Sequence, residues 1–324
     1  FLLFITSCGK RKDNSDKNEK LNKSYLKYFD TSVDGNKLYL KNNYVEINED
    51  LFIPSNYEVV INKDLIITNN AFIISESPWI VKGLNGKKIQ ISGKENNFGG
   101  GILIRNSKKK SYFENVNFSY FSGNYSKENY SDLILMGSVN FYNTNLVIKE
   151  TTFKAISSED ALNVVNSNFD FNDLYFQDIA SDAVDFDFSK GNAKSLFFSR
   201  IGNDGVDFSG SISEISNLSF DQIGDKMISI GENSNIDINN VSGNNGFVGI
   251  AVKDGSSTRL ENININNSTI GFATYIKKPE YKFPTTNVNK FKFKDVKKNF
   301  ISDSNSKIIF KDKKNNLILS ISND

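Results

Sequence analysis

The chain contains no histidine among its 324 residues and a single cysteine, Cys8. Without histidine it cannot form a Ser–His–Asp triad, a histidine-ligated zinc site or any mechanism with an imidazole base. One cysteine excludes an intrachain disulfide framework and every metal site with several cysteine ligands. Any catalytic chemistry must therefore come from Asp, Glu, Lys, Arg or Tyr.

Proline is also scarce, with 4 residues, and neither sign of charge prevails. The 39 basic and 38 acidic side chains give a formal net charge of +1, so no overall field favours a nucleic-acid partner. Phenylalanine, in contrast, is abundant at 27 residues within a hydrophobic fraction of 38%. This composition is sufficient to fill a continuous core.

A short apolar run precedes Cys8, and a charged segment follows it. Residues 1–7 resemble the end of a signal-peptide core, and Ile5-Thr6-Ser7-Cys8 resembles a bacterial lipobox, in which the cysteine receives a lipid. No later stretch approaches the ~20 apolar residues of a membrane-spanning helix. We therefore expect a lipid anchor at Cys8 and a polar tether over 8–43, which place the protein in the periplasm or at the cell surface of a bacterium. The alternative is a short buried run with an incidental cysteine.

The middle of the chain repeats with a period of ~22 residues. The repeats are SSEDALNV (157–164), SDAVDFDF (181–188), GNDGVDFSGS (202–211), GDKMISIGENS (224–234) and NNGFVGIAVKDGS (244–256). Aligned, with one shortened step, they predict an apolar column of Leu162, Val184, Val206, Ile228, Val248 and Ile270. Two residues on, a second apolar column holds Val164, Phe186, Phe208, Ile230, Ile250 and Phe272. The column between them is Asn163, Asp185, Asp207, Ser229, Gly249 and Gly271.

This in–out–in alternation is the pattern of half-buried strands, and short strands separated by turns begin at Tyr44. A ~22-residue repeat without a helical segment differs from leucine-rich repeats and from the ~40-residue blades of propellers. The sequence therefore predicts an all-β, right-handed parallel β-helix over 44–324, with about a dozen coils.

Aspartates recur at fixed places in these coils. One turn column holds Asp160, Asp182, Asp204 and then Lys226. On the strands, Asp185 and Asp207 are outward neighbours, and Asp187 follows. Carboxylates stacked ~5 Å apart repel by about 3 kcal/mol at an effective dielectric of 20, so they require solvation, a nearby cation or a raised pKa. The alternative is structural, because aspartate fills solenoid turns and caps backbone amides.

The segment 134–283 resembles a group of bacterial secreted or surface right-handed β-helix proteins. Their signature runs close to EDALN, SDAxDxDF, GNDxxDxSGS, GDKxISxGExS, KDxS and KKPEYG. The matching segments here are Glu159–Asn163, Ser181–Phe188, Gly202–Ser211, Gly224–Ser234, Lys253–Ser256 and Lys277–Tyr281. The resemblance implies a surface module associated with extracellular polysaccharide.

A looser similarity links the repeats to the polygalacturonase family of glycoside hydrolases, which has NTD, GDD, GHG and RIK on consecutive coils. Here Asp182, Asp204, GDKMISIG and Lys253 stand near those positions, and Asn203 and Ala251 depart from the pattern. The similarity implies that Asp182 and Asp204 activate water. An asparagine cannot donate a proton to a leaving group, so Asn203 cannot take the acid role.

The β-helix polysaccharide lyases are a further comparison, because they combine calcium with a Lys, Arg or Tyr base. That similarity implies a possible calcium ion held by Asp185, Asp187 and Asp207, with Lys226 or Lys253 as the base.

Together these observations predict a protein that binds or processes an extracellular polysaccharide. We expect Asp185, Asp207, Asp225 and Lys253 to bind the substrate. If the protein is an enzyme, we expect Asp182, Asp204 and Lys226 to be catalytic. The alternatives are a structural or adhesive solenoid without catalysis, and a lyase or hydrolase of acidic glycans.

Overall fold

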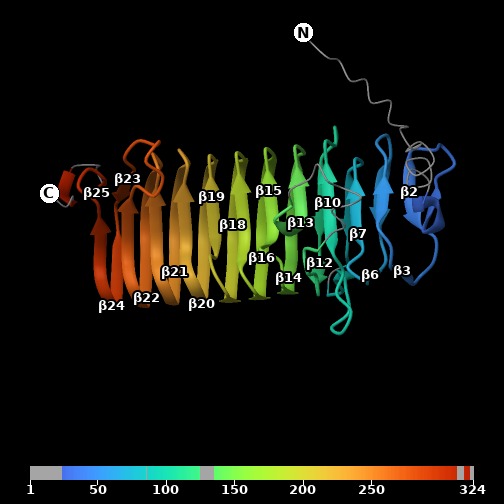
Figure 1. Cartoon of the computed structure of the whole chain (residues 1–324), viewed down its shortest axis with the longest axis horizontal. Coiled ribbons are helices and arrows are strands. Elements are labelled where there is room, and N and C mark those ends of the chain that lie inside the picture. Colours follow the sequence, from blue (N-terminus) through green and yellow to red (C-terminus); the bar gives the residue numbers. More distant parts are fainter. Residues whose placement is uncertain (1–23, 85, 125–134, 312–316, 322–324) are drawn as a thin grey trace, which may run out of the picture.

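In the computed structural model the chain forms a parallel β-solenoid of about 12 turns with ~22 residues per turn, as the repeat predicts. The structure describes residues 24–84, 86–124, 135–311 and 317–321, so Cys8 and the expected signal segment lie outside it. A short 3-10 helix, η1 (Ser24–Lys27), precedes the strands. The coils stack along one long axis, with β2 and β25 near opposite ends of the stack (Figure 1). No helix of the described residues has the length and apolar character to cross a membrane.

Three parallel ladders of strands run along this axis. The first ladder consists of β4 (Leu51–Ile53), β7 (Phe72–Ser75), β10 (Gly101–Arg105), β13 (Gly137–Tyr142), β15 (Asp160–Val165), β17 (Asp182–Asp187) and β19 (Val206–Ser209). It continues through the last residues of the long strands β20 (Ile212–Gly231), β21 (Asn235–Lys253), β22 (Ser257–Tyr275) and β24 (Phe291–Ser302).

The second and third ladders form the other sides of the solenoid. The second contains β2 (Lys37–Leu40), β5 (Glu58–Ile61), β8 (Trp79–Lys82), β11 (Ser111–Glu114), the first parts of β14 (Leu146–Ile156), β16 (Asn168–Ile179), β18 (Lys190–Ile201) and β20–β22, and then β23 (Thr285–Val288) and β25 (Lys307–Lys311). The third contains β3 (Val45–Ile47), β6 (Leu65–Ile67), β9 (Ile89–Ser92), β12 (Val116–Ser119), the later parts of β14, β16, β18 and β20–β22, and the first part of β24. Two strands pair antiparallel at the ends of the second ladder: β1 (Phe29–Thr31) with β2, and β26 (Leu317–Ile321) with β25.

The register corrects one part of the sequence alignment. Ile228 is paired with Ile250 rather than Val248, and Ile230 with Val252 rather than Ile250. The predicted pairs of Val248 with Ile270 and of Ile250 with Phe272 are confirmed. The column through Asp185 and Asp207 therefore continues through Ser229, Ala251 and Ala273, not through Gly249 and Gly271. The alignment assumed a shortened step here, whereas 22 residues separate Ile228 from Ile250, as they separate Val206 from Ile228. A β-bulge lies between Ile223 and Lys226, where β20 has one residue more than β21.

Stacked apolar side chains fill the interior of the solenoid. In the third ladder Phe153, Phe176, Phe198 and Phe220 form a column with ring centroids 4.8, 5.1 and 4.7 Å apart and nearly parallel planes. This distance equals the separation of neighbouring strands, so one identical side chain per coil packs without a gap. The stack thus gives each outward side chain a fixed neighbour on the coils before and after it.

Candidate functional site

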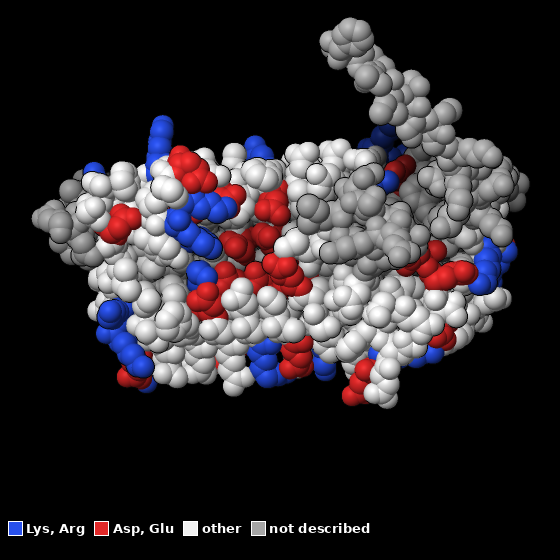
Figure 2. Space-filling view, viewed as in Figure 1, with Lys and Arg blue, Asp and Glu red and all other residues white. Residues whose placement is uncertain are grey.

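The outer face of the first ladder gathers most of the predicted site residues. We call this surface the acidic face and define it by Asp160, Asp182, Asp185, Asp187, Asp204 and Asp207. Figure 2 shows acidic side chains concentrated near the middle of one face of the molecule, with basic side chains directly beside them. The acidic face lies on β15, β17 and β19 and on the turn before β19.

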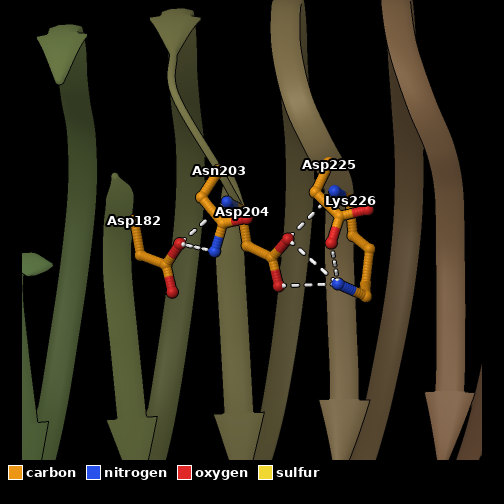
Figure 3. A network of polar contacts seen from close by, with 5 residues as sticks. All are labelled: Asp182, Asn203, Asp204, Asp225 and Lys226. Atoms are coloured by element: carbon orange, nitrogen blue, oxygen red, sulfur yellow. Dashed lines mark hydrogen bonds and ion pairs between the residues drawn. The ribbon is translucent and has the colours of Figure 1, made fainter. Parts of the chain in front are cut away.

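Two of these carboxylates serve the fold. Asp182 Oδ1 accepts hydrogen bonds from the backbone N–H of Asp204 at 2.8 Å and from Asn203 Nδ2 at 2.6 Å (Figure 3). Asp204 Oδ1 in turn accepts the backbone N–H of Lys226 at 2.9 Å. Each carboxylate therefore caps an amide of the next coil, as the structural alternative predicted.

Lys226 adds a fixed positive charge to this column. Its Nζ lies 3.3 and 3.4 Å from the two carboxylate oxygens of Asp204 and also contacts the carboxylate of Asp225 (Figure 3). The bulge in β20 positions this side chain, because a bulge turns the strand locally. Burial lowers the pKa of Lys226, but hydrogen bonds and charge from Asp225 and Asp204 outweigh it and raise the pKa above its usual value. These contacts favour an ammonium ion over a lysine base.

Asp185 and Asp207 differ from the turn column. They are paired on adjacent strands of the first ladder, and both side chains are half-buried. The Oδ1 atom of each is buried and has no hydrogen-bond partner among the described residues. A buried polar atom without a partner costs roughly 1–3 kcal/mol, more when it is charged. The Oδ1 atoms of these two carboxyl groups therefore form no hydrogen bond that stabilises the fold in the described structure.

The carboxyl groups of the acidic face differ in how readily they ionise. Burial, together with the charges of Asp182 and Glu159, raises the pKa of Asp160 to about 8. Burial also raises the pKa of Asp204 to about 6, against the opposing effect of Lys226. The pKa of Asp185 is raised well above its usual value by burial and by the neighbouring acids, Asp187 foremost. At neutral pH the face therefore combines protonated and ionised carboxyl groups.

Three carboxylates come close enough to share one proton, water or cation. One oxygen each of Asp182, Asp204 and Asp207 lies within 4.8 Å of the other two. Their hard oxygen ligands fit calcium, and the Asp207 oxygen without a partner supports this fit, whereas Lys226 already neutralises Asp204. Asp207 is the member that this group has in common with the predicted calcium ligands.

Lys253, another predicted binding residue, lies at one edge of the acidic face. A neighbouring outward column runs through Asp187, Ser209, Gly231, Lys253 and Tyr275. The Lys253 side chain lies over Gly231, where a Cβ would be 3.5 Å from Lys253 Cε. Lys253 is only 6% exposed, and within the described parts of the chain it forms no ion pair. Asp225, in contrast, is bound to Lys226.

Tyr275 is the one residue of this edge that sequence reasoning missed. It follows Lys253 in register and is half-buried, and burial raises the pKa of its hydroxyl. Asp187 lies on the same column and accepts a hydrogen bond from Asn163 Nδ2 at 3.5 Å. Correct alignment of β20 with β21 would have predicted the position of Tyr275, because it places Lys253 and Tyr275 in the column of Asp187, Ser209 and Gly231.

No protein-family model and no curated protein match the chain. Among solved structures, the periplasmic alginate epimerase AlgG is similar at 10% identity over 88% of this chain and 82% of that chain, with a TM-score of 0.49. The catalytic domain of a GH87 α-1,3-glucanase shares 12% identity over 83% of this chain and 62% of that chain, with a TM-score of 0.32. Tailspike protein 3 of bacteriophage CBA120 shares 12% over 93% and 59%, with a TM-score of 0.32. The chain is thus distantly similar in fold to β-helix proteins that act on carbohydrates and to a phage tailspike.

Proposed function

We propose that the protein binds an extracellular polysaccharide along the acidic face and cleaves it by acid–base catalysis. One observation carries the proposal: Asp185 and Asp207 hold buried carboxyl oxygens without a partner, beside carboxylates that the fold does use. Hydroxyl groups of a sugar would supply the missing donors. Binding would thus remove the free-energy cost of leaving these oxygens unpaired, and only the ligand-free protein would carry it.

The different ionisation of the carboxyl groups supports an acid and a base on one surface. Burial and the neighbouring acids raise the pKa of Asp185 well above its usual value, which favours its protonated form, and it would donate this proton to the glycosidic oxygen. Burial raises the pKa of Asp182 above its usual value against the opposing effect of its two hydrogen bonds, which makes its carboxylate a stronger base, and it would take a proton from water. The water oxygen then bonds to the anomeric carbon as the bond to the leaving oxygen breaks, which balances the hydrolysis.

Lys253 supports an acidic polysaccharide as the substrate. A buried ammonium group without a counter-ion in the described structure favours an anionic ligand, since pairing offsets its loss of hydration. A uronate carboxylate bound to Lys253 would place the neighbouring sugar toward Asp185 and Asp207.

The test is an assay of reducing-end release on a panel of polyuronates and uncharged polysaccharides. We expect the wild type to release reducing ends, and Asp182→Asn and Asp185→Asn to lose the activity. Glu95→Gln, which changes an exposed acid in the turn after β9, should retain it. If the wild type releases nothing from any polymer, catalysis is refuted. If, in addition, Asp207→Asn and Lys253→Met bind the polymers with the same affinity as the wild type, the result supports the alternative of a structural or adhesive solenoid.

Calcium-dependent lyase chemistry is the second candidate, favoured by the three carboxylates within 4.8 Å of one another. A bound calcium ion would neutralise a uronate carboxylate and acidify the adjacent proton. Its product is an unsaturated uronate, which absorbs in the ultraviolet. Product formation that requires CaCl₂ and is abolished by EGTA would select this reaction over hydrolysis, and release of saturated ends in EGTA would exclude it.

We propose further that the protein is held at a membrane through a lipid on Cys8. The support is the lipobox-like Ile5-Thr6-Ser7-Cys8. In native cells we expect the wild type in the membrane fraction and Cys8→Ser in the soluble extracytoplasmic fraction. An unmodified Cys8 in mass spectra of the membrane-derived protein would refute the anchor.

A further inference from the structure

A hollow lies on the third ladder, which is a different side of the solenoid from the acidic face. It crosses β18, β20, β21 and β22 and has a volume of about 320 Å³, within the usual range for small-ligand sites. We call it the aromatic groove and define it by Phe197, Leu218, Ser219, Asn240, Val241 and Ser242. None of the residues that line it carries a charge.

An exposed pair of aromatic rings forms one end of this groove. Tyr175 and Phe197 stack with centroids 4.7 Å apart and planes 8° from parallel, and they remain 42% and 37% exposed. Their chain neighbours Phe176 and Phe198 already fill the core column. Lys88 Nζ lies over the Tyr175 ring, 5.4 Å from the ring centroid. The ring of Phe197 thus borders the groove and presents apolar surface to solvent.

Amide and hydroxyl groups form the rest of the lining. Asn217 and Asn240 stand at a corner where φ is 58° and 60°, and Asn240 Nδ2 donates to Asn217 Oδ1 at 3.0 Å. Each amide retains further donor and acceptor capacity, because a primary amide can form about four hydrogen bonds. Ser219 and Ser242 present their hydroxyl groups from successive coils. The buried floor is apolar, at Leu218 and Val241.

We propose that the aromatic groove binds a segment of an uncharged oligosaccharide. A pyranose ring has an apolar C–H face and a rim of hydroxyl groups, which match Phe197 with Tyr175 and the amide and hydroxyl lining respectively. The coils repeat every ~4.8 Å along the axis, close to the length of one sugar unit, so a glycan lying along the axis meets equivalent groups on each coil. The absence of charge in the lining distinguishes this ligand from the acidic polysaccharide proposed for the acidic face.

The experiment is calorimetric titration of the full chain with four uncharged hexasaccharides: maltohexaose, cellohexaose, laminarihexaose and mannohexaose. We expect at least one to bind, and Phe197→Ala to bind it about tenfold more weakly, as expected for loss of an aromatic anchor. Phe197→Leu keeps apolar bulk and should also weaken binding, because the flat ring is lost. Tyr44→Ala removes an aromatic that is 61% exposed on another coil and should leave binding unchanged.

The acidic-face variant Asp207→Asn separates this site from the proposed catalytic site. Unchanged hexasaccharide binding by Asp207→Asn, with loss in Phe197→Ala, supports the aromatic groove whether or not the acidic face is active. Loss in Asp207→Asn with unchanged binding in Phe197→Ala would place the uncharged ligand on the acidic face and overturn the inference. An absence of wild-type binding to all four sugars at millimolar concentration would also overturn it.

Discussion

Asp182 and Asp185 lie three positions apart on β17 and have opposite relations to the fold. Asp182 Oδ1 satisfies the backbone N–H of Asp204, whereas Asp185 Oδ1 satisfies no group in the described structure. Removing a hydrogen-bond acceptor destabilises a protein, but removing an unsatisfied buried carboxyl does not. The same residue type is therefore structural at one position and available to a ligand at the other.

This contrast predicts different effects on stability. Asp182→Ala should lower the free energy of unfolding by about 1–3 kcal/mol, because the Asp204 amide loses its partner. Asp185→Ala should leave the free energy of unfolding unchanged or higher, since a desolvated carboxyl is removed. Urea denaturation at pH 7 measures both.

Asp182→Asn is the matched control, because its side-chain oxygen can still accept the Asp204 N–H, and it should recover most of the stability lost in Asp182→Ala. A loss in Asp185→Ala as large as that in Asp182→Ala would show that Asp185 belongs to the fold. That result would remove the main support for a ligand on the acidic face.

At the level of the strand, β18 places two consecutive phenylalanines on opposite sides of the solenoid wall. Phe198 packs in the core column between Phe176 and Phe220, whereas Phe197 lies outside against Tyr175. Phe198→Ala should lower the free energy of unfolding by about 3–5 kcal/mol, because it leaves a cavity in a close-packed column. Phe197→Ala should cost less than about 1.5 kcal/mol, the value of an exposed ring pair.

Guanidinium denaturation of the two variants side by side tests this difference. Equal losses would mean that the outer rings are part of the structural core, which would also weaken the aromatic groove as a binding site. A small loss in Phe197→Ala would confirm that its ring is not required for folding.

The strands were predictable because each coil repeats the same alternation of buried and exposed positions. The two columns through Leu162 and Val164 gave the parallel β-helix without any knowledge of the turns. The register after Ile228 was mispredicted because the alignment assumed a shortened step, whereas an extra residue in the turn before Ser234 and the bulge before Lys226 compensate each other and keep 22 residues between Ile228 and Ile250. Spacing alone detects neither change.

The candidate site was predictable in its residue types but not in its roles. The aspartate columns follow from the repeat, and the structure places Asp182, Asp204 and Asp207 together. Which carboxyl oxygens lack a partner depends on atomic positions around each side chain, which a repeat pattern does not contain. The aromatic groove was missed for a similar reason: alternation with the core residues Phe176 and Phe198 places Tyr175 and Phe197 on the outside, but a repeat pattern does not show that their rings stack beside a hollow.

On the scale of the whole molecule, the two ends of the second ladder are covered by strands of opposite direction. β1 pairs antiparallel with β2, and β26 pairs antiparallel with β25. An unpaired edge would offer backbone N–H and C=O groups to another chain, so these strands limit end-to-end association. The three long sides of the solenoid, in contrast, present outward side chains in columns, and the acidic face and the aromatic groove lie on two of those sides.

The acidic face also governs how the stability of the whole solenoid depends on pH. Asp160 has its pKa raised from 3.8 to about 8 and Asp204 from 3.8 to about 6, so between these values the folded protein holds protons that the unfolded chain has lost. Stability must then fall as pH rises, by ~1.4 kcal/mol per pH unit for each such group within its own window. Carboxylates with lowered pKa, such as Glu46 and Asp178, act oppositely, and their contribution is lost as pH falls through the folded-state pKa.

We therefore expect the melting temperature to be highest at about pH 4 to 5 and to fall steadily toward pH 8, most steeply below pH 6, where both groups titrate. Thermal melts of the wild type from pH 3 to pH 9 measure this profile. Asp160→Asn removes the group that titrates last, so its melting temperature should fall less between pH 6 and pH 8. If Asp160→Asn and the wild type have the same profile in that range, or if the wild type is more stable at pH 8 than at pH 5, the buried carboxyl groups do not keep their protons. The acid role of the neighbouring Asp185 would then lose its physical basis.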